Sequence, residues 1–522
     1  MLRLTIDNRA IEVPPGATLL EAARRLGIEI PTLCHLDGCA ASTSCMVCLV
    51  KVKNPDRFVP SCAAPAVGGM EVESQTAEVH DARQAALELL LSDHPGDCIA
   101  PCQGVCPARM DIPRMIRRMA AGDVAGAVRA ARAALVLPAT LGRICPAPCE
   151  KGCRRAGHDA ALSIRLLHRL AADADLASAM PWLPEVKPAT GKRVAIIGAG
   201  PAGLAAAWRL RQDGHAATLF DDQKEPGGML RYGVEESRLP RAILDAEIAL
   251  VRRLGAEFRM GTRVGRDVAL AALAAEFDAV LVACGELEEG QAAGLGLETS
   301  AHGVQIEKQT YRTSATGVFA AGDAVQGRQM AVRAVAEGQA AAACIGLHLA
   351  GQDVAAPPRP FTTRLGRPTD AEMAAMVAAA SPDGRVVPAG GEPGGLTLGE
   401  ARREAPRCLH CDCRKTDVCR LRRWADALGA RPARYGGTRR PFELHAQHPD
   451  IVYEPGKCIA CGLCIQIASR GREPLGLAFI GRGFNVRVDV PFNETLAEGL
   501  KRTGAECVAA CPTGALAFRN ET

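Results

Sequence analysis

Cysteine is the residue that most constrains what this chain can fold into. The 522 residues include 22 cysteines, and almost all of them fall in tight groups towards the two ends of the sequence. A secreted scaffold built on disulfides would be short, whereas this chain is long and carries a nucleotide-binding motif in its middle. Closely spaced thiols in a reducing compartment are metal ligands far more often than disulfide partners. The sequence therefore predicts a cytoplasmic, multidomain metalloprotein.

Charge and hydropathy argue against two other classes of protein. The 62 basic and 58 acidic side chains leave a net charge of +4, which is too even for a nucleic-acid-binding surface. No apolar run approaches the roughly 20 residues of a membrane span. The opening MLRLTIDNRAIEV alternates like a pair of strands and lacks the apolar core of a signal peptide. We expect no nucleic-acid partner and no membrane span.

The N-terminal segment predicts a small sheet that carries cysteines on its loops. LRLTIDNRAIEV is typical of a hairpin, and TLLEAARRLG of a helix capped by Thr18. The cysteines that follow are spaced C-x10-C-x2-C-x13-C on a β-grasp-like frame. With SCAAPAVGGMEV, this segment resembles the [2Fe–2S] domain that opens the large iron–sulfur subunit of respiratory complex I and related formate dehydrogenases. The resemblance implies the ligands Cys34, Cys45, Cys48 and Cys62, and it leaves Cys39 as a spare thiol.

The next segment resembles two families in turn. LLLSDHPGDC is similar to a sequence motif of the same complex I subunit, in which the histidine of H-P-x-D-C ligates a [4Fe–4S] cluster. CIAPCQGVCPARMDIPRMI and LGRICPAPCEKGC resemble the helical domain of the glutamate synthase small subunit and of dihydropyrimidine dehydrogenase. That domain holds two [4Fe–4S] clusters between two cysteine runs. The resemblance assigns Cys98, Cys102 and Cys153 to one cluster, and Cys106, Cys145 and Cys149 to the other.

Each of these two sets lacks a fourth ligand. In the family one fourth ligand is a cysteine three residues before Cys98, where this chain has Pro95, and His94 is the nearest competent donor. The other is a Gln or Glu four residues after an isoleucine, the position that His168 occupies after Ile164. We predict both histidines as ligands, the alternative being surface or capping residues. Imidazole in place of thiolate removes negative charge, which raises the potential of a cluster.

A dinucleotide-binding motif lies in the middle of the chain. RVAIIGAGPAGLAAAWRLRQDG predicts a strand, a G-x-G-x-x-G turn and a helix whose N-terminus faces a pyrophosphate. The next strand, HAATLFD, ends in Asp221, which is placed to accept a hydrogen bond from a ribose hydroxyl. EPGGMLRYG and GVFAAGDA complete a resemblance to the FAD site of the glutamate synthase small-subunit family. The resemblance implies contacts from Gly198, Ala199, Gly200, Pro201, Ala202, Gly203, Asp221, Gly228, Met229, Leu230, Gly285, Gly322 and Asp323.

The same family has a domain for which this chain has no room. A whole NAD(P)H-binding domain lies there between the strand that ends like AVLVACG and the Gly-Asp pair of ATGVFAAGDA. Here residues 286–316 alone separate Gly285 from Gly317. A βαβ unit needs about 30 residues, and no apolar strand precedes the only glycine-rich turn of this segment, GLGLET. The segment predicts a short connection in place of that domain. Cys284, just before it, is either a redox thiol or a small core residue.

Two cysteine groups follow a linker rich in Pro, Gly and Ala. EAPRCLHCDCRKTDVC, with the spacing C-x2-C-x-C-x5-C, predicts a [4Fe–4S] cluster, and zinc is the alternative metal. KCIACGLCIQIA and ECVAACPTGAL resemble a two-cluster ferredoxin. Ala468, Lys501 and Gly504 replace three of the four ligands of the second ferredoxin cluster, so Cys507 is left spare. The predicted ligands are Cys408, Cys411, Cys413 and Cys419 in the first group, and Cys458, Cys461, Cys464 and Cys511 in the second.

These observations predict a multidomain α/β and α+β protein. The expected order is a β-grasp 2Fe–2S domain (1–80), a helical domain with two 4Fe–4S clusters (81–185), a Rossmann-like FAD domain (190–351), a linker (352–400), a cysteine-rich module (401–440) and a ferredoxin-like domain with one 4Fe–4S cluster (441–522).

The predicted function is electron transfer. One FAD, one [2Fe–2S] and four [4Fe–4S] clusters would pass electrons to or from a partner, with an NADH-binding FMN subunit or a molybdenum or tungsten formate dehydrogenase as the leading candidates. One alternative is a self-sufficient NAD(P)H oxidoreductase, and another is an assembly scaffold with vestigial cofactors. The sequence does not single out a catalytic residue.

Overall fold

The chain folds into two compact units that interleave along the sequence. The computed structural model describes residues 1–287, 294–327, 330–356 and 360–519. The first unit comprises Met1–Ala100, Pro360–Ala380 and Leu409–Glu521. The second comprises Pro101–Arg359 and Ser381–Cys408. The second unit is therefore an insertion that interrupts the first.

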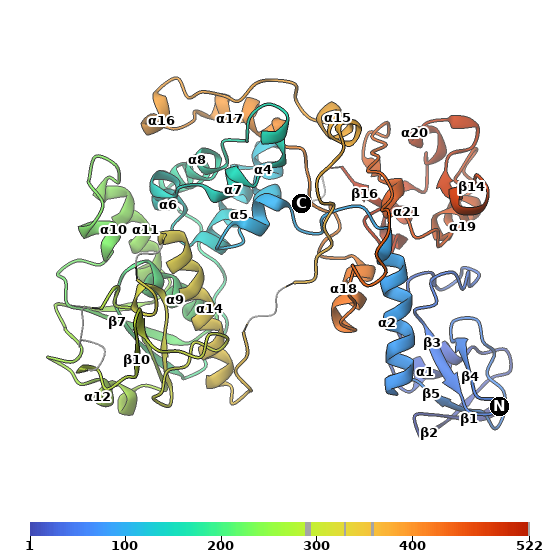
Figure 1. The fold of residues 1–522 in the computed structure, drawn as a ribbon, viewed down its shortest axis with the longest axis horizontal. Coiled ribbons are helices and arrows are strands. Elements are labelled where there is room, and N and C mark those ends of the chain that lie inside the picture. The colour runs from blue at the N-terminus through green and yellow to red at the C-terminus, as the bar shows by residue number, and fades with distance from the viewer. Residues whose placement is uncertain (288–293, 328–329, 357–359, 520–522) are drawn as a thin grey trace. The chain divides into compact units, whose positions relative to one another are not determined.

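A five-stranded sheet opens the first unit (Figure 1). The hairpin predicted at the N-terminus is present, and Leu4 and Ile6 alternate towards the core as its period of two requires. A Thr18–Glu21 capping box starts the short helix that packs on the sheet. The sheet order is β2-β1-β5-β3-β4, from β1 (Leu2–Ile6), β2 (Arg9–Val13), β3 (Leu49–Val52), β4 (Arg57–Pro60) and β5 (Glu71–Glu73), with α1 (Leu19–Arg25). The mixed sheet with one helix confirms the predicted 2Fe–2S ferredoxin fold.

A long helix links this sheet to the rest of the first unit. Helix α2 (Ala77–Ser92) lies beside α18 (Arg420–Ala427), and the Gln84 side chain donates to the Gly429 carbonyl oxygen at 2.9 Å (Figure 1). Leu87 and Leu91 of α2 share a buried core with Cys34, Cys45, Leu421 and Cys461. Cysteines that are remote in sequence therefore meet around one apolar core.

The C-terminal part of the first unit consists of short elements. Helices α19 (Leu463–Arg470) and α21 (Gly504–Ala510) pack together, and β13 (Ile451–Tyr453) pairs antiparallel with β16 (Leu516–Phe518). A second antiparallel pair and two more helices complete this part: β14 (Ala478–Ile480), β15 (Arg487–Asp489), α20 (Leu496–Gly499) and α15 (Asp370–Ala378).

The second unit begins with a group of helices and continues into a parallel sheet. The helices are α3 (Pro101–Val105), α4 (Ile112–Ala120), α5 (Val124–Leu135), α6 (Pro138–Ile144), α7 (Pro148–Lys151) and α8 (Ile164–Leu176). The sheet order is β12-β9-β6-β7-β8, from β6 (Arg193–Ile197), β7 (Ala216–Asp221), β8 (Glu257–Met260), β9 (Ala279–Val282) and β12 (Val318–Ala320). This order places the topological switch point of a doubly wound fold between β6 and β9. The Rossmann-like prediction is confirmed.

Helices flank the parallel sheet, and two of them make an unusually close pair. Gly338 of α14 approaches the backbone of α9 so closely that a Cβ there would lie 2.1 Å from the Ala202 carbonyl oxygen. Only glycine permits that approach. The helices of this region are α9 (Pro201–Gln212), α10 (Met229–Tyr232), α11 (Arg241–Arg253), α12 (Leu270–Glu276) and α14 (Ala331–Leu349), and α16 (Gly391–Gly394) and α17 (Leu398–Glu404) follow later in the chain.

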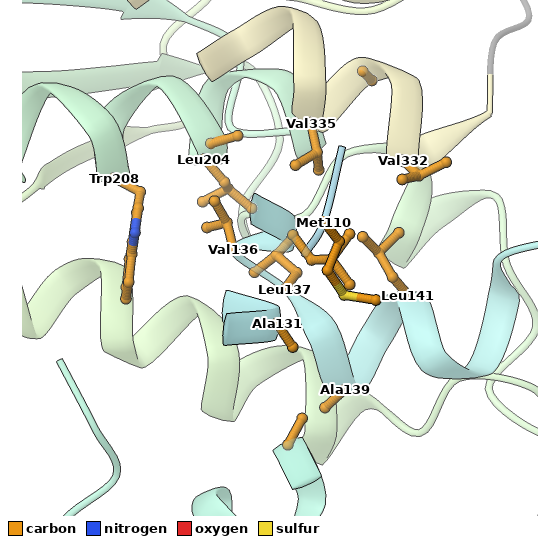
Figure 2. Close-up of a cluster of buried hydrophobic side chains, with 14 of the residues drawn as sticks. Met110, Ala131, Val136, Leu137, Ala139, Leu141, Leu204, Trp208, Val332 and Val335 are labelled. Carbon is orange, nitrogen blue, oxygen red and sulfur yellow. The ribbon is translucent and has the colours of Figure 1, made fainter. Parts of the chain in front are cut away.

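One hydrophobic core joins the two halves of the second unit. Figure 2 shows Met110, Leu137 and Leu141 of the helical half against Leu204 of α9 and Val335 of α14. All five side chains are almost completely buried. The helical half and the nucleotide-binding half therefore fold as one body.

A buried carboxylate fixes this junction. Glu247 of α11 is 1% exposed, and its two oxygens each accept a 2.8 Å hydrogen bond, from the backbone N–H groups of Ala139 and Thr140. These donors lie in the first turn of α6, where an α-helix has no internal acceptors for them. Burial raises the pKa of Glu247 to about 7.

The segment expected to be a linker is more structured than its composition indicates. Residues 360–380 belong to the first unit and 381–408 to the second. Capping boxes begin both α15, at Thr369, and α17, at Thr397. Residues 357–359 lie outside the described residues.

Within the described residues, no single helix has both the length and the apolar character to cross a membrane. Helices α5 and α6 meet the criterion only as a pair, with a bend of 77° between them.

Replacing Glu247 with Ala tests the junction. The change leaves two buried N–H groups unpaired, at about 1–3 kcal/mol each, so we expect a loss of about 2–6 kcal/mol in the free energy of unfolding. Chemical denaturation of the full chain measures it. Glu276→Ala is the matched control, because Glu276 forms only a half-exposed ion pair with Arg193 and should cost less than about 1 kcal/mol. Equal losses in both variants would contradict the role given to Glu247.

Candidate functional site

The predicted dinucleotide contacts come together at the carboxyl ends of β6, β9 and β12. A Cβ at Gly198 would lie 2.3 Å from the Ala283 carbonyl oxygen, which follows β9. A Cβ at Gly322, after β12, would lie 3.0 Å from the Ala202 Cβ. A Cβ at Gly228 would lie 2.9 Å from the Gly200 Cα. Four segments of chain therefore converge at the switch point, which is where α/β sheets bind nucleotides in a crevice.

The three glycines of the motif have different roles. A Cβ at Gly203 would lie 2.0 Å from the Gly198 carbonyl oxygen, so this glycine is required for packing. The nearest atom to a Cβ at Gly200 would be 3.8 Å away, and Gly200 has φ near −80°, so other residues fit its conformation. Gly200 therefore leaves open space in front of the N-terminus of α9, as a pyrophosphate requires. The arrangement fits a dinucleotide.

Asp221 is occupied by the turn itself. Its Oδ2 accepts from the Ala199 N–H at 2.7 Å and its Oδ1 from the Gln223 N–H at 2.9 Å. Burial raises its pKa. The carboxylate thus shapes the glycine turn, and its role towards a ribose hydroxyl remains a prediction.

Two further predicted contacts differ in their exposure. The Leu230 side chain is 2% exposed and belongs to the core, so only its backbone is available to a ligand, whereas Met229 is 65% exposed. The sequence analysis missed Glu337 of α14, whose Oε2 accepts from the Gly322 N–H at 3.1 Å and so fixes the Gly-Asp turn. A lone acidic residue in a helix of small apolar residues was the available signal.

The four cysteines of the N-terminal loops form one buried group. Cys34 accepts hydrogen bonds from Cys45 and Cys62, which lower its pKa, and Cys62 also bonds to Cys48. The fully buried Arg83 lies in electrostatic range of Cys48, and within the described part of the chain its Nη2 has no hydrogen-bond partner. A buried guanidinium in electrostatic range of Cys48 and Asp7 fits an anionic cluster, because burial of a cation requires compensating negative charge.

A second group of thiols lies among the helices of the second unit. Burial, and after it the neighbouring Cys106, raises the pKa of both Cys145 and Cys149, so the three lie within electrostatic range of one another. His168 is 4% exposed, and its Nδ1 lies 3.2 Å from the Pro138 carbonyl oxygen. If Nδ1 donates this bond, Nε2 carries the free lone pair. Histidines that ligate metals commonly donate their other N–H to a backbone carbonyl in this way.

A cavity in the first unit is lined by the four predicted ferredoxin-type ligands. These ligands are Cys458, Cys461, Cys464 and Cys511. The rest of the cavity wall is mainly apolar, with Leu463, Val488 and Leu516 among the lining residues. Cys507 is not among the lining residues. Its Sγ lies 3.6 Å from the Cys464 carbonyl oxygen and 3.9 Å from the Thr503 Oγ1. The donor set and the apolar walls fit an iron–sulfur cluster.

Two predicted sets are divided between the units. Cys98 belongs to the first unit, whereas Cys102 and Cys153 belong to the second. The boundary also separates Cys408 from Cys411, Cys413 and Cys419. Within the described residues, no three His, Cys, Asp or Glu side chains are arranged around a single metal ion.

Comparison with known families matches three segments of the chain. Residues 1–77 match the 2Fe–2S iron–sulfur cluster binding domain, and residues 78–180 match domain II of dihydropyrimidine dehydrogenase, a 4Fe–4S cluster domain. Residues 196–248 match the NAD(P)-binding Rossmann-like domain. The chain carries iron–sulfur domains in front of a Rossmann-like domain. The family resemblance seen in the sequence is confirmed.

Curated relatives share about a third of this chain. The beta subunit of NADP(+)-dependent formate dehydrogenase from Moorella thermoacetica is 40% identical over 36% of this chain and 29% of its own length. The PreT subunit of NAD-dependent dihydropyrimidine dehydrogenase from Escherichia coli K12 is 40% identical over 36% of this chain and 45% of its own length. The glutamate synthase [NADPH] small chain of Bacillus subtilis is 39% identical over 28% of this chain and 30% of its own length. The chain thus spans less than half the length of each of these oxidoreductase subunits.

Replacing Gly200 with Ala should separate nucleotide binding from folding. The new methyl group has space in the protein and enters the space in front of α9, so we expect an intact fold and at least about a tenfold loss of bound dinucleotide. Chromatography of the nucleotide released on heat denaturation measures it. Gly203→Ala is the contrasting variant: its methyl group meets the Gly198 carbonyl oxygen, so the fold itself should suffer. Full nucleotide content in Gly200→Ala would place the ligand elsewhere.

Cys511 and Cys507 form a matched pair on the same helix end. Cys511→Ser should remove one cluster, about four irons per chain, because Cys511 lines the cavity. Cys507→Ser should remove none, because its thiol faces the backbone and Thr503. Iron analysis and electron paramagnetic resonance (EPR) of anaerobically purified protein measure both. Loss of a cluster in Cys507→Ser alone would reverse the assignment.

Proposed function

We propose that the chain is an electron-transfer subunit of a larger oxidoreductase complex, with FAD in the glycine crevice and iron–sulfur clusters on both units. The cluster domains and the Rossmann-like domain support this, as do relatives that are oxidoreductase subunits. A flavin supplies conversion between two-electron and one-electron chemistry. The residues of this chain hold the dinucleotide, exclude water from the thiols and fix the ligand positions.

The single observation that carries the proposal is the short path from β9 to β12. These strands are parallel neighbours in one sheet, and the described part of residues 286–316 contains the hairpin of β10 (Thr299–Ser300) and β11 (Gly303–Val304), with Gly294 as its one helical residue. A Cβ at Gly303 would lie 2.3 Å from the Ala324 carbonyl oxygen, so the hairpin packs against the Gly-Asp turn. Residues 288–293 lie outside the described residues. Among the described residues there is one parallel five-stranded sheet.

The consequence concerns hydride transfer. Direct transfer requires donor and acceptor atoms about 3–3.5 Å apart and correctly oriented. With one dinucleotide crevice occupied by FAD, the described chain offers no second cradle to orient a nicotinamide. We infer that electrons reach the flavin from a partner subunit through the clusters, and that the partner is an NADH-binding FMN subunit or a molybdenum- or tungsten-dependent formate dehydrogenase subunit.

A second candidate has one observation in its favour. The family that matches residues 196–248 is described as NAD(P)-binding. On this alternative the crevice holds a pyridine nucleotide itself, and the chain oxidises or reduces it directly. Identification of the nucleotide released from the purified protein separates the two, because FAD supports the first and NAD(P) the second.

Mixing the isolated chain with NADH or NADPH under argon tests the proposal. We expect no loss of flavin absorbance on the timescale of catalysis, because the chain does not orient the nicotinamide. Adding the native partner with its substrate should bleach the flavin. Dithionite should bleach it in the same sample, which shows that the flavin is reducible. Rapid stoichiometric reduction by either nucleotide alone would establish a self-sufficient dehydrogenase instead.

A further inference from the structure

Cys98 has its neighbours within the first unit. Its Sγ lies 3.4 Å from the Thr363 Oγ1, and its carbonyl oxygen accepts from the Thr416 hydroxyl at 2.8 Å, across 318 residues of sequence. The Cys413 N–H also points to this oxygen at 3.5 Å. Two other stretches of the first unit therefore converge on Cys98, which is 8% exposed.

Two further thiols lie close to Cys98. The Arg422 Nη1 donates to the Thr416 carbonyl oxygen at 2.9 Å. Arg422 therefore ties the segment that carries Cys419 to Thr416, whose hydroxyl bonds the Cys98 carbonyl oxygen. The Thr416 hydroxyl lies 2.6 Å from the Cys413 carbonyl oxygen as well, so it links the backbones that carry the two thiols. The Arg422 N–H donates to the Cys419 Sγ at 3.4 Å, a bond that stabilises negative charge on sulfur.

A buried lysine connects His94 to the same place. A Cβ at Gly514 would lie 2.3 Å from the Cys413 Sγ and 3.8 Å from the Lys457 Cδ. A Cβ at Gly96, two residues after His94, would lie 2.8 Å from the Lys457 Cε. The stem of Lys457 therefore runs from Cys413 towards the turn that carries His94. Its ammonium group pairs with Glu454 at 2.6 Å, and both side chains are buried.

We propose that Cys98, Cys413 and Cys419, with His94 as the fourth ligand, bind one [4Fe–4S] cluster that belongs wholly to the first unit. The site is discontinuous, because the entire second unit lies between Cys98 and Cys413 in the sequence. Cys411 is not assigned to this site, and it packs against the apolar core of Leu365, Met376 and Leu409. The grouping replaces the two sets that the sequence suggested, in which Cys98 joined Cys102 and the thiols of residues 408–419 joined one another.

The regrouping leaves a second consistent set of thiols. Cys102, Cys153 and Cys408 all belong to the second unit. The Arg155 Nη1, two residues after Cys153, donates to the Arg407 carbonyl oxygen at 2.6 Å, and Arg407 precedes Cys408. A Cβ at Gly152 would lie 2.6 Å from the Val105 Cγ2 of α3, the helix that carries Cys102. These three thiols therefore remain as ligands of a second [4Fe–4S] cluster, and the total iron per chain is unchanged.

The proposed site also continues a path through the first unit. Cys34 and Cys45 of the N-terminal group share a buried core with Cys461, which lines the cavity. The Cys419 Sγ lies 3.7 Å from the carbonyl oxygen of Pro512, which lines the same cavity. The cavity is therefore adjacent both to the [2Fe–2S] group and to the proposed cluster, as a relay for single electrons requires.

Crossed double variants of the full chain test the grouping. Cys98→Ser, Cys413→Ser and Cys102→Ser should each lose about four irons per chain and one [4Fe–4S] signal. Cys98→Ser with Cys413→Ser should lose no more than either alone, because both changes empty one site. Cys98→Ser with Cys102→Ser should lose about eight. Iron analysis and EPR after anaerobic purification measure these losses, with the [2Fe–2S] signal as internal reference. The reverse pattern, about eight for the first pair and four for the second, would overturn the proposal.

A ligand exchange keeps the test decisive if a serine variant does not fold. His94→Cys should retain every cluster and lower the potential of one [4Fe–4S] centre, because thiolate adds the negative charge that imidazole lacks. A redox titration followed by EPR measures it, and Cys411→Ser should leave all potentials and the iron content unchanged. Unaltered potentials in His94→Cys would remove His94 from the site, and loss of a cluster in Cys411→Ser would overturn the exclusion of Cys411. None of these readouts depends on the flavin or on a partner, so they stand apart from the proposed function.

Discussion

The burial of cysteine side chains is the constraint on which the first unit depends. Cys34, Cys45 and Cys461 are nearly inaccessible and share a core with Leu87 and Leu421. A thiolate buried among such side chains is unfavourable unless it is ligated or hydrogen bonded, because the surroundings do not solvate its charge. The hydrogen bond to Cys34 and then burial raise the pKa of Cys45, and burial raises that of Cys461, so metal binding must release the protons of these two thiols. The fold positions the thiols, and the metal in turn stabilises the fold.

Local sequence patterns were sufficient for the individual modules. The period-two alternation around Leu4 and Ile6 predicts the first hairpin, and the strand, glycine turn and helix at Gly198–Gly203 predict the crevice, because both depend on neighbouring residues alone. The ferredoxin-type register likewise distinguishes Cys511, which lines the cavity, from Cys507, which does not. In each case the spacing of residues along the chain determines where their side chains lie in the element.

The sequence did not predict which module a cysteine belongs to when the chain returns from far away. Cys98 and Cys102 are one helical turn apart in sequence, which favours a shared cluster, yet the unit boundary falls between them at Ala100. For the same reason, the sequence does not predict which side chains accept hydrogen bonds from buried donors. Glu247 has no signal in a local pattern, because its partners are backbone groups of a helix more than 100 residues earlier in the chain. Long-range pairing is decided by tertiary packing, which a window of sequence does not contain.

The insertion of one unit into another explains why the proposed cluster lies where it does. A domain is inserted without disturbing its host only if the points where the chain leaves and returns are close together. Here the chain leaves at Ala100 and returns finally at Leu409, and the Cys98 carbonyl oxygen accepts from both Thr416 and the Cys413 N–H. The chain also returns to the first unit between these two points, at Pro360–Ala380. This segment lies in the same place, because the Thr363 hydroxyl donates to the Gly96 carbonyl oxygen at 2.8 Å. Ligands on both sides of the insertion would tie these strands of chain together through iron. The same atoms would then close the host fold and carry electrons through it.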